Sequence, residues 1–305
     1  MCAKVCLENL SKFNIIMVTI IIPSRNERFL QKTILDILNK ARGEVEVIAN
    51  LDGYWPPVNE IVDDSRVRYL HHGTVKGLRH GINAGVDVAT GEHIMKIDGH
   101  CMFDEGFDIK LVADCEENWV VIPRRYSLDA ENWKIDESRP YRDYHYLCYP
   151  SPTKDHDMGM HGVEWLERGR ERLDPKYDID DNMSFQGSCW FMHKKWFVDF
   201  LEGMSEEEIY NTWAQEPTEI GCKTWLGGGR VVCNKKTFYA HLHKGRQWGR
   251  GYQMDDAKQV EGHNYAARYW MNNSWPKQIH NIDWLIEKFM PVPTWPEDRA
   301  RWVAP

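Results

Sequence analysis

Residues 17–23 (MVTIIIP) form a continuous run that is rich in β-branched side chains, is apolar except at Thr19 and ends in proline. Such a run is typical of a strand in a parallel sheet that is covered by helices on both faces. Apolar residues then recur at helical spacing from Phe29 to Ala41, and Gly43 supplies the predicted end of that helix. This part of the chain therefore predicts one strand–helix unit of an α/β fold.

The same alternation continues over the next hundred residues. Strands are predicted at 45–52, 67–71, 93–98 and 119–126, and helices at 78–88 (closed by Gly91) and 107–115. Such alternation predicts a doubly wound, mostly parallel sheet flanked by helices, whose ligands bind at the carboxyl ends of the strands.

The alternation of strands and helices stops between residues 127 and 181, which are rich in tyrosine, tryptophan, arginine and aspartate. We interpret this stretch as a long active-site insertion. Apolar residues resume at 183–193. Further helices are predicted at 194–201, around 206–212, at 216–226 (broken by glycines 227–229) and at 283–289, with strands at 231–232 and 238–242.

Composition excludes several classes of protein. The 305 residues carry 38 Lys and Arg against 46 Asp and Glu, a formal net charge of −8, which argues against a globally basic nucleic-acid-binding surface but not against a local basic groove. The apolar run at 15–22 is shorter than the roughly 20 residues of a membrane span. Eight cysteines without a CxxC pair, and no secretion signal at 1–10, predict free thiols and a cytoplasmic protein.

Two polar segments at predicted strand ends are candidates for ligand binding. Asp98-Gly99-His100 follows a buried strand, and an aspartate and a histidine two residues apart can face one crevice and hold a metal, although a satisfied turn is the commoner role of such a triplet. Residues 23–27 and Asp52 follow two further strands and suit a nucleotide base and ribose. Helix capping by Ser24 and Asn26 is the alternative, but it leaves Asp52 unexplained.

Two helical segments carry further candidates. Arg79 lies near the start of the helix at 78–88, where a basic side chain and backbone N–H groups favour a diphosphate, while Gly81 and Gly85 also suit close helix–sheet packing. Glu216 and Glu219 share one helical face, so at least one could face a cleft, unless the helix is merely a solvated acidic one.

His241 and His243 alternate along a strand, so only one of them is expected to join a given site.

Together these segments resemble the nucleotide-sugar half of GT-A fold glycosyltransferases, family 2 in broad terms. The Asp-x-His triplet at 98–100 is similar to that of the polypeptide N-acetylgalactosaminyltransferases. Residues 187–191 (GSCWF) resemble their Gly-Gly-Leu-Phe segment, and Glu216-x-x-Glu219-Ile220 with Trp225 and Gly228-Gly229 resembles their Glu-Asn-Leu-Glu-Ile helix. His241 falls on their third metal-ligand histidine, and the resemblance spans roughly residues 18–244.

The resemblance implies a metal-dependent transferase of GT-A type. Asp98, His100 and His241 would hold Mn²⁺, or Mg²⁺, against the diphosphate of a UDP-sugar. Glu216 and Glu219 would be catalytic, as a base in an inverting mechanism or as acceptor-positioning groups in a retaining one. The nucleotide-sugar would be bound by Pro23, Arg25, Asn26, Glu27, Asp52, Arg79, Asn83 and Asp98. By the same resemblance, residues 17–126 form the nucleotide-sugar-binding half and 127–250 the acceptor-binding and catalytic half, between an N-terminal extension (1–16) and a C-terminal helical and Pro/Trp-rich tail (251–305).

Two departures from that family leave the acceptor open. Trp213-Ala214-Gln215 replaces its Trp-Gly-Gly, and we expect the C-terminal lectin domain of that family to be absent. The chain also resembles stand-alone transferases of phage type, some of which decorate hydroxymethylated pyrimidines in double-stranded DNA, which would place it in the host cytoplasm.

A basic aromatic groove for such DNA is expected in the insertion, although Asp178, Asp180 and Asp181 oppose it. Its members would be Arg124, Arg125, Arg139, Arg142, Arg168, Arg170, Arg172, Trp133, Tyr141, Tyr144, Tyr146 and Trp165, with a second basic cluster at Lys235, Lys236, Lys244, Arg246 and Arg250. A glycan or protein acceptor is the alternative, as is a non-catalytic carbohydrate-binding or nucleotide-sugar-binding module. A nucleotidyltransferase would need a glycine-rich loop that residues 24–27 lack.

Overall fold

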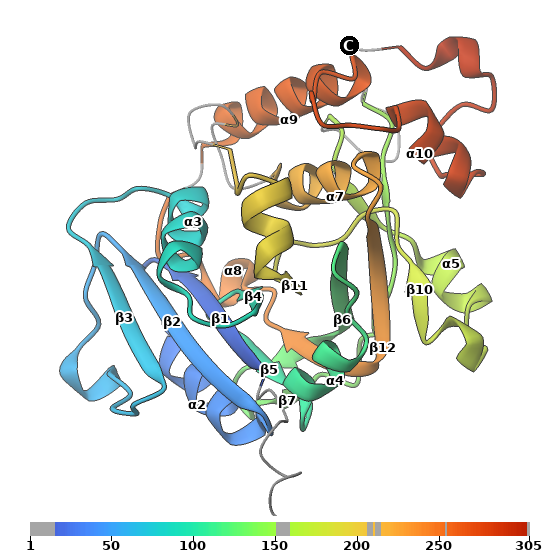
Figure 1. Ribbon diagram of the computed structural model, residues 1–305. Coiled ribbons are helices and arrows are strands. Elements are labelled where there is room, and N and C mark those ends of the chain that lie inside the picture. Colours follow the sequence, from blue (N-terminus) through green and yellow to red (C-terminus); the bar gives the residue numbers. More distant parts are fainter. Residues whose placement is uncertain (1–15, 151–158, 206–209, 211–214, 254, 304–305) are drawn as a thin grey trace, which may run out of the picture.

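The computed structural model describes residues 16–150, 159–205, 210, 215–253 and 255–303, without the side chain of Arg246. Most of the helix predicted around 206–212 and of the N-terminal extension lies outside these residues. The described chain forms a central sheet whose main path runs β10-β12-β6-β11-β4-β1-β2-β3 (Figure 1). These strands are β1 (Met17–Ser24), β2 (Glu44–Asp52), β3 (Val67–His72), β4 (His93–Ile97), β6 (Trp119–Asp129), β10 (Ile179–Asp181), β11 (Cys189–His193) and β12 (Arg230–His241).

The predicted mostly parallel sheet is confirmed. Strand β1 pairs in parallel with β2 and β4, β2 with β3, and β6 with β12. Strand β11 is antiparallel to both β4 and β6 and joins the two parallel parts. Two short strands lie off the main path: β5 (Cys101–Phe103) pairs with β12, and β7 (Lys134–Ile135) pairs with β6.

Helices cover both faces of the sheet, which explains the almost entirely apolar run in β1. Val18, Ile20 and Ile22 belong to the core under α2 (Leu30–Lys40) and α4 (Phe107–Ala113). Ile21 belongs to the core on the other face, under α3 (Leu78–Val88), α7 (Glu216–Leu226), α9 (Asp256–Met271) and α10 (Ile282–Phe289). Because successive side chains of a strand point to opposite faces, a strand buried on both sides is apolar at nearly every position. Thr19 is the exception in β1, and its hydroxyl donates a hydrogen bond to Glu46 (2.8 Å).

Several predicted boundaries are wrong for local reasons. The two strands expected at 231–232 and 238–242 are one strand, β12, with a register shift against β6 between Asn234 and Phe238. Helices α2 and α3 end at alanines in extended conformation, Ala41 and Ala89, so neither Gly43 nor Gly91 is the cap. Gly91 instead allows a close approach: a Cβ there would lie 2.7 Å from the carbonyl oxygen of Met17. The helix expected at 194–201 is a π-helix, η3 (Trp196–Phe200).

The insertion is packed against the sheet and the C-terminal helices. It contains β8 (His145–Leu147), β9 (Gly162–Glu164), α5 (Leu166–Glu171) and the 3-10 helix η2 (Pro175–Tyr177). Tyr144, Tyr146 and Trp165 lie in the same apolar core as α9 and α10. The remaining short helices are η1 (Val58–Glu60), α8 (Gly245–Trp248) and η5 (Arg299–Arg301). In the part of the chain that the structure describes, no helix has the length and apolar character of a membrane span.

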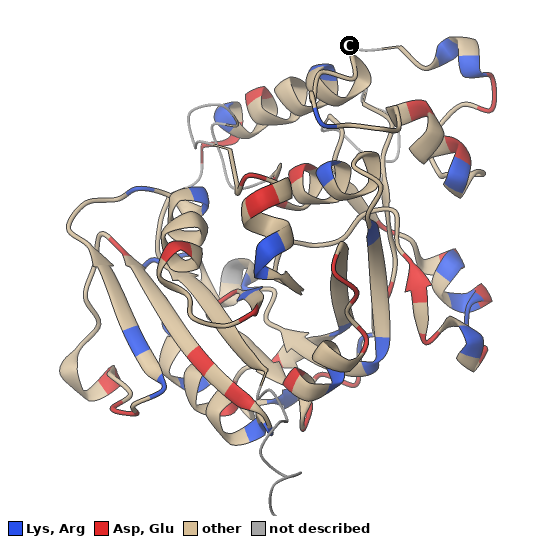
Figure 2. Cartoon of the chain, in the orientation of Figure 1, with Lys and Arg blue, Asp and Glu red and all other residues tan. Residues whose placement is uncertain are grey.

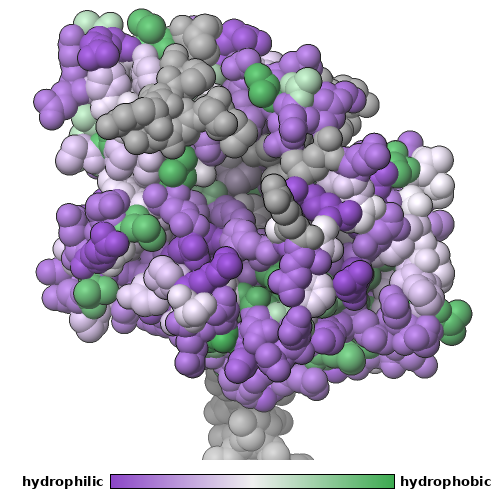
Figure 3. All heavy atoms as spheres, turned by 180° about the vertical axis from the view of Figure 1, so that it is seen from behind, coloured by the Kyte–Doolittle hydropathy of each residue, from purple (hydrophilic) through white to green (hydrophobic). Residues whose placement is uncertain are grey.

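The surface fits this picture of two buried cores. From the side opposite to Figure 1, the molecule is mainly hydrophilic and its apolar residues are scattered singly (Figure 3). Scattered apolar residues of this kind are normal on a protein surface and do not mark an interface on that face.

Candidate functional site

The structure brings the three predicted metal ligands together at one edge of the sheet. Asp98 and His100 follow β4, and His241 is the last residue of β12, which pairs there with β5. Nε2 of His241 lies 3.0 Å from Nε2 of His100 and 3.3 Å from Oδ2 of Asp98. One ligand atom from each residue lies within 4.8 Å of the others, which is the arrangement needed to hold one divalent cation.

Gly99 allows the turn that joins two of these ligands. A Cβ at Gly99 would lie 2.8 Å from Cγ of Glu27, so a side chain there would push against the loop after β1. The backbone on either side is held by its neighbours, since Asp98 N donates to Ser188 O (2.9 Å) and Leu242 N donates to His100 O (3.1 Å). The absence of a side chain at residue 99 therefore lets the Asp98–His100 segment pack closely against the loop after β1.

Glu27 holds His100 in a metal-binding orientation. Its Oε2 lies 3.0 Å from Nδ1 of His100, and it also pairs with Lys244. Burial opposes the charge of Glu27, but His100 and Lys244 outweigh burial and lower the pKa of Glu27. An imidazole that donates its Nδ1 proton to this carboxylate presents the lone pair of Nε2 toward Asp98 and His241. Glu27, expected to contact the nucleotide, is thus placed behind a metal ligand.

The other histidine of the cluster is suited to bind a metal in its neutral form. His241 is buried, and burial together with the nearby His100 lowers the pKa of His241 to about 3, although its hydrogen bond to Asp98 opposes this shift. A metal ligand must be an unprotonated imidazole, so no proton has to be removed from His241 at neutral pH.

Lys96 is a buried cation that the sequence reasoning missed. It is 1% exposed, and its Nζ lies 2.9 Å from Oδ1 of Asp98, 3.1 Å from Oε2 of Glu216 and 2.6 Å from the carbonyl oxygen of Gly187. Burial opposes its charge, but the two carboxylates raise the pKa of Lys96 above its ordinary value. A lone lysine inside an otherwise apolar strand (HIMKI) was the available signal, because a buried ammonium needs anionic partners.

Glu216 lies beside the metal-ligand cluster, as predicted for one of the two glutamates. Its Oε1 accepts a hydrogen bond from Trp190 Nε1 (2.6 Å), and its other oxygen faces Lys96. Burial raises the pKa of Glu216 despite the nearby lysine. A Cβ at Gly187 would lie 3.0 Å from Oε2 of Glu216, so the glycine leaves room for the carboxylate.

Glu219 and Arg79 form a buried ion pair between α7 and α3. Both side chains are fully buried, Glu219 also pairs with Lys223 (2.8 Å), and Arg79 stacks on Tyr210 at 4.1 Å. The carboxylate further accepts from the backbone N–H and hydroxyl of Ser205. Both side chains face partners inside the fold, so this placement favours a structural role over the predicted roles of Glu219 as a base and of Arg79 as a diphosphate ligand.

Two other residues predicted to bind the nucleotide-sugar have their polar groups engaged by backbone. The amide of Asn83 donates to Met204 O and accepts from Met204 N, both at 2.9 Å. The carboxylate of Asp52 accepts from Lys76 N (2.6 Å) and Gly77 N (3.2 Å), which shapes the loop before α3. Asp52 nevertheless lies at the carboxyl end of β2, where a ligand of this fold would bind.

The loop after β1 meets residues 251–252. Arg25 and Asn26 are exposed, Asn26 adopts a left-handed conformation with φ 50°, and its Nδ2 donates to Gly251 O (2.9 Å). The Arg25 guanidinium lies 5.8 Å from the centre of the Tyr252 ring. Pro23 is half-buried at the end of β1. These groups lie at the strand end at which the sequence predicted a nucleotide.

His243 does not turn away from the site, so the expectation that only one of the two histidines can join it is wrong. Residues two apart in an extended chain point to the same side, and the His241 and His243 rings lie 5.0 Å apart. A guanidinium nitrogen of Arg125 lies 2.7 Å from His243 Nε2.

The basic aromatic groove expected in the insertion is not formed by the residues proposed for it. Tyr144, Tyr146 and Trp165 are core residues, and acidic and basic side chains are interspersed over α5 and β10 (Figure 2). The arginines and lysines face acidic groups close to them: Arg124 pairs with Asp143, Arg125 and Arg142 with Glu164, Arg139 with Asp136, Arg170 with Glu167, Arg168 and Arg172 with Asp180, Lys236 with Asp114 and Lys244 with Glu27. Most of the basic side chains proposed for the groove thus have an acidic neighbour, although Arg139, Arg170 and Lys236 are themselves exposed.

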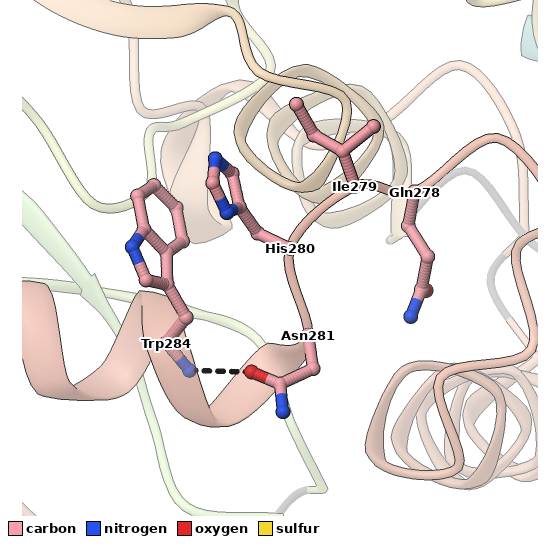
Figure 4. Close-up of a pocket in the computed structure, with 5 residues that line it drawn as sticks. All are labelled: Gln278, Ile279, His280, Asn281 and Trp284. Atoms are coloured by element: carbon pink, nitrogen blue, oxygen red, sulfur yellow. Dashed lines mark hydrogen bonds between the residues drawn. The ribbon is translucent and has the colours of Figure 1, made fainter.

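A separate surface hollow lies at the start of α10 and is lined by Gln278, Ile279, His280, Asn281 and Trp284 (Figure 4). His280 stacks on Trp284, and Asn281 Oδ1 accepts from Trp284 N (2.9 Å) as a helix cap. The backbone N–H groups of 279 and 280 donate to Leu226 O, at the end of α7 opposite to Glu216. The hollow is therefore distinct from the metal-ligand cluster.

The amino-acid sequence is similar to those of known polypeptide N-acetylgalactosaminyltransferases. Polypeptide N-acetylgalactosaminyltransferase 3 of Mus musculus is 26% identical over 213 residues (68% of this chain, 32% of that protein). A putative polypeptide N-acetylgalactosaminyltransferase 13 of Drosophila melanogaster is 25% identical over 252 residues (75% and 42%). The chain thus spans less than half the length of these relatives.

Solved structures show the same fold. Crystalline GalNAc-T7 with UDP, GalNAc and Mn²⁺ matches with a TM-score of 0.67 at 15% identity, over 91% of this chain and 57% of that one. TarS 1–349 of S. aureus with UDP-GlcNAc matches with a TM-score of 0.55 at 13% identity, over 86% and 68%. The fold is therefore that of the GT-A enzymes. The model of the family described as glycosyl transferase family 2 matches residues 19–201, more than half of the chain, so the protein belongs to glycosyl transferase family 2.

Proposed function

We propose that this protein is a metal-dependent glycosyltransferase that moves a sugar from a UDP-linked donor to an acceptor hydroxyl. The observation that carries the proposal is the convergence of Asp98, His100 and His241 at the carboxyl ends of β4 and β12. Membership of the family and the UDP and Mn²⁺ named with a structural neighbour support it. A module that only binds sugar would need neither the three ligands nor the carboxylate of Glu216 beside them.

The donor atoms of the cluster fit a divalent cation such as Mn²⁺. One carboxylate and two imidazoles are borderline ligands, which suit Mn²⁺ better than the all-oxygen preference of Mg²⁺. Asp98 is 30% exposed at its side chain, so the cluster is open on the side from which a diphosphate would approach. When bound, the metal supplies positive charge that stabilises the departing nucleoside diphosphate.

The two glutamates predicted to be catalytic receive different roles in this proposal. Glu216 is buried like Glu219, but Lys96 links it to Asp98, and for this reason we assign the catalytic carboxylate to Glu216. Glu219 is a structural residue that joins α7 to α3 through Arg79.

For the acceptor we propose a hydroxyl of a protein or a glycan. The printed names of the sequence relatives are those of polypeptide transferases. Hydroxymethylated pyrimidine in phage-type DNA, the acceptor predicted from the sequence, depended on arginines that the structure pairs with carboxylates. It is therefore kept as one arm of the test.

The test is turnover of a panel of UDP-sugars with Mn²⁺, followed by UDP release. Acceptors are serine- and threonine-containing peptides, oligosaccharides and duplex DNA containing hydroxymethylcytosine or hydroxymethyluracil, and products are measured by mass spectrometry. We expect UDP release that a chelator abolishes and a sugar-sized mass gain on a peptide or glycan. A sugar-sized mass gain on the modified base would show that DNA is the acceptor instead. The absence of turnover with every donor would contradict the proposal that the protein is a glycosyltransferase.

Replacing Glu27 by alanine should weaken Mn²⁺ binding by about 10–100-fold, the usual effect of removing the partner that orients a ligand histidine. Without the carboxylate, the His100 ring loses both its orientation and the acceptor for its Nδ1 proton. Mn²⁺ binding is measured by titration with detection of free metal by electron paramagnetic resonance. The exposed Glu44 supplies the control, Glu44→Ala, which should bind Mn²⁺ like the wild type. Equal affinity of Glu27→Ala and wild type would remove Glu27 from the site.

A further inference from the structure

A second cluster of metal-binding side chains lies at the opposite edge of the sheet. It consists of His93 at the start of β4, His193 at the end of β11 and Cys115 in the loop after α4. One ligand atom from each lies within 4.8 Å of the others. The strand β4 separates this cluster from Asp98, and five residues of strand span about 16 Å. The two clusters therefore do not share a metal.

The sheet itself places the two histidines side by side. His93 and His193 are direct partners in the antiparallel pairing of β4 with β11, so their side chains leave the same face of the sheet. That face carries Met95 and Ile97 and is covered by α2 and α4. Cys115 follows α4 and packs against the same apolar core. Three segments far apart in the sequence thus converge through the register of the sheet.

We propose that His93, Cys115 and His193 form a zinc site. The Nε2 atoms of the two histidines lie 3.2 Å apart, and two imidazoles on one tetrahedral zinc lie about 3.3 Å apart. A thiolate on the same zinc lies about 3.6 Å from each nitrogen, so Sγ of Cys115 reaches its position with a shift of about 1 Å or less. The histidine pair is therefore already spaced as two zinc ligands.

The chemistry of the donor set distinguishes this site from the Asp98 cluster. A thiolate with two imidazoles favours zinc over Mn²⁺, whereas a carboxylate with two imidazoles accepts Mn²⁺. On binding, the Cys115 thiol releases its proton to solvent and its sulfur forms the bond to the metal. Among the described residues no further His, Cys, Asp or Glu joins the group, so water completes the tetrahedron.

Zinc at this place would tie the loop after α4 to the edge of β4 and β11. His93 is buried, while Cys115 and His193 are half-buried, which leaves a route for the ion from solvent. A metal that binds only the folded chain stabilises it in proportion to the logarithm of its concentration over its dissociation constant. We therefore expect zinc to raise the melting temperature of the protein.

The test uses Co²⁺ as a spectroscopic substitute for zinc on the full chain. A thiolate-to-cobalt charge-transfer band in the near ultraviolet reports sulfur coordination, which the Asp98 cluster cannot supply. We expect this band to saturate at one equivalent in the wild type and in Asp98→Ala, and to be bleached by zinc. It should be absent from Cys115→Ser and His193→Ala. Cys148→Ser is the matched control, because Cys148 also lies beside a histidine, His161, and should keep the band.

Zinc content after dialysis gives a second readout that does not depend on cobalt. Cys115→Ser should hold one equivalent less zinc than the wild type and lack the zinc-induced rise in melting temperature, while its Mn²⁺-dependent turnover is unchanged. Absence of the band in folded wild-type protein at saturating cobalt would overturn the site. Persistence of the band in Cys115→Ser, or its loss in Cys148→Ser alone, would also overturn it by assigning the sulfur to another cysteine.

Discussion

Asp98→Ala and His241→Ala are each expected to lower sugar transfer by at least about a hundredfold, the scale of removing one group that stabilises developing negative charge. Each change removes one of three metal ligands, so the leaving diphosphate loses the charge that stabilises it. The fold should survive the loss of Asp98, because Lys96 keeps its second carboxylate partner, Glu216. UDP release is measured over a Mn²⁺ titration, with thermal unfolding as the check on folding.

The matched control is Asp63→Ala, a change at an exposed aspartate that should leave both turnover and unfolding unaltered. Saturating Mn²⁺ should not restore turnover in Asp98→Ala, because the variant lacks an anionic ligand that added metal cannot replace. Normal metal-dependent turnover in either variant would show that the cluster is not the catalytic metal site.

Glu219→Gln is expected to lower the free energy of unfolding by about 3–5 kcal/mol, the usual result of removing one partner from a buried ion pair. The variant removes the carboxylate that faces the buried guanidinium of Arg79 between α3 and α7. Urea denaturation measures the change. The double variant Arg79→Met/Glu219→Met should recover much of the loss, because it removes both buried charges together. A single variant as stable as the wild type would contradict the structural role assigned to Glu219.

The pH dependence of this loss in unfolding free energy distinguishes the contribution of the buried ion pair from that of side-chain packing. Burial opposes ionisation of Glu219, but Arg79 and Lys223 outweigh it and hold its pKa below the ordinary value of 4.5. A lowered pKa in the folded state means that the ion pair stabilises the protein above pH 4.5 and is lost as the pH falls through the folded-state value. The difference in free energy of unfolding between wild type and Glu219→Gln should therefore become smaller at acidic pH. Glu202→Gln, at an exposed pair with Lys277, should show little change at any pH.

The order of strands and helices in the first half of the chain could be read from the sequence, because local periodicity determines it. The run at 17–23 is β1 and the helix at 78–88 is α3 at the predicted residues. The helix at 216–226 is α7 with its predicted boundaries. The helix α9, by contrast, was anticipated only as part of a helical tail. Its buried face is mixed, with Gly262, His263, two alanines and Trp270, so the sequence shows no clear apolar stripe.

The candidate site was predicted in part, and the missing part depends on contacts between distant segments. Asp98, His100 and His241 could be proposed because short motifs carry their chemistry. The packing of helices against one another decides whether a glutamate of α7 faces a ligand or a buried arginine, and the sequence alone does not show this packing. Glu216 and Glu219, three residues apart on α7, therefore have different surroundings, with Lys96 beside one and Arg79 beside the other.

The sequence by itself determined the alternation of buried strands and helices and the three residues able to hold a metal, since these follow from the period of apolar side chains and the chemistry of single residues. Only the tertiary structure decided which charges are neutralised. The arginines of the insertion, Lys96 and the His93–Cys115–His193 group acquire their partners through strand register and helix packing. A charge or a lone pair has a role only in relation to its neighbours, and in this chain those neighbours come from segments far apart in the sequence.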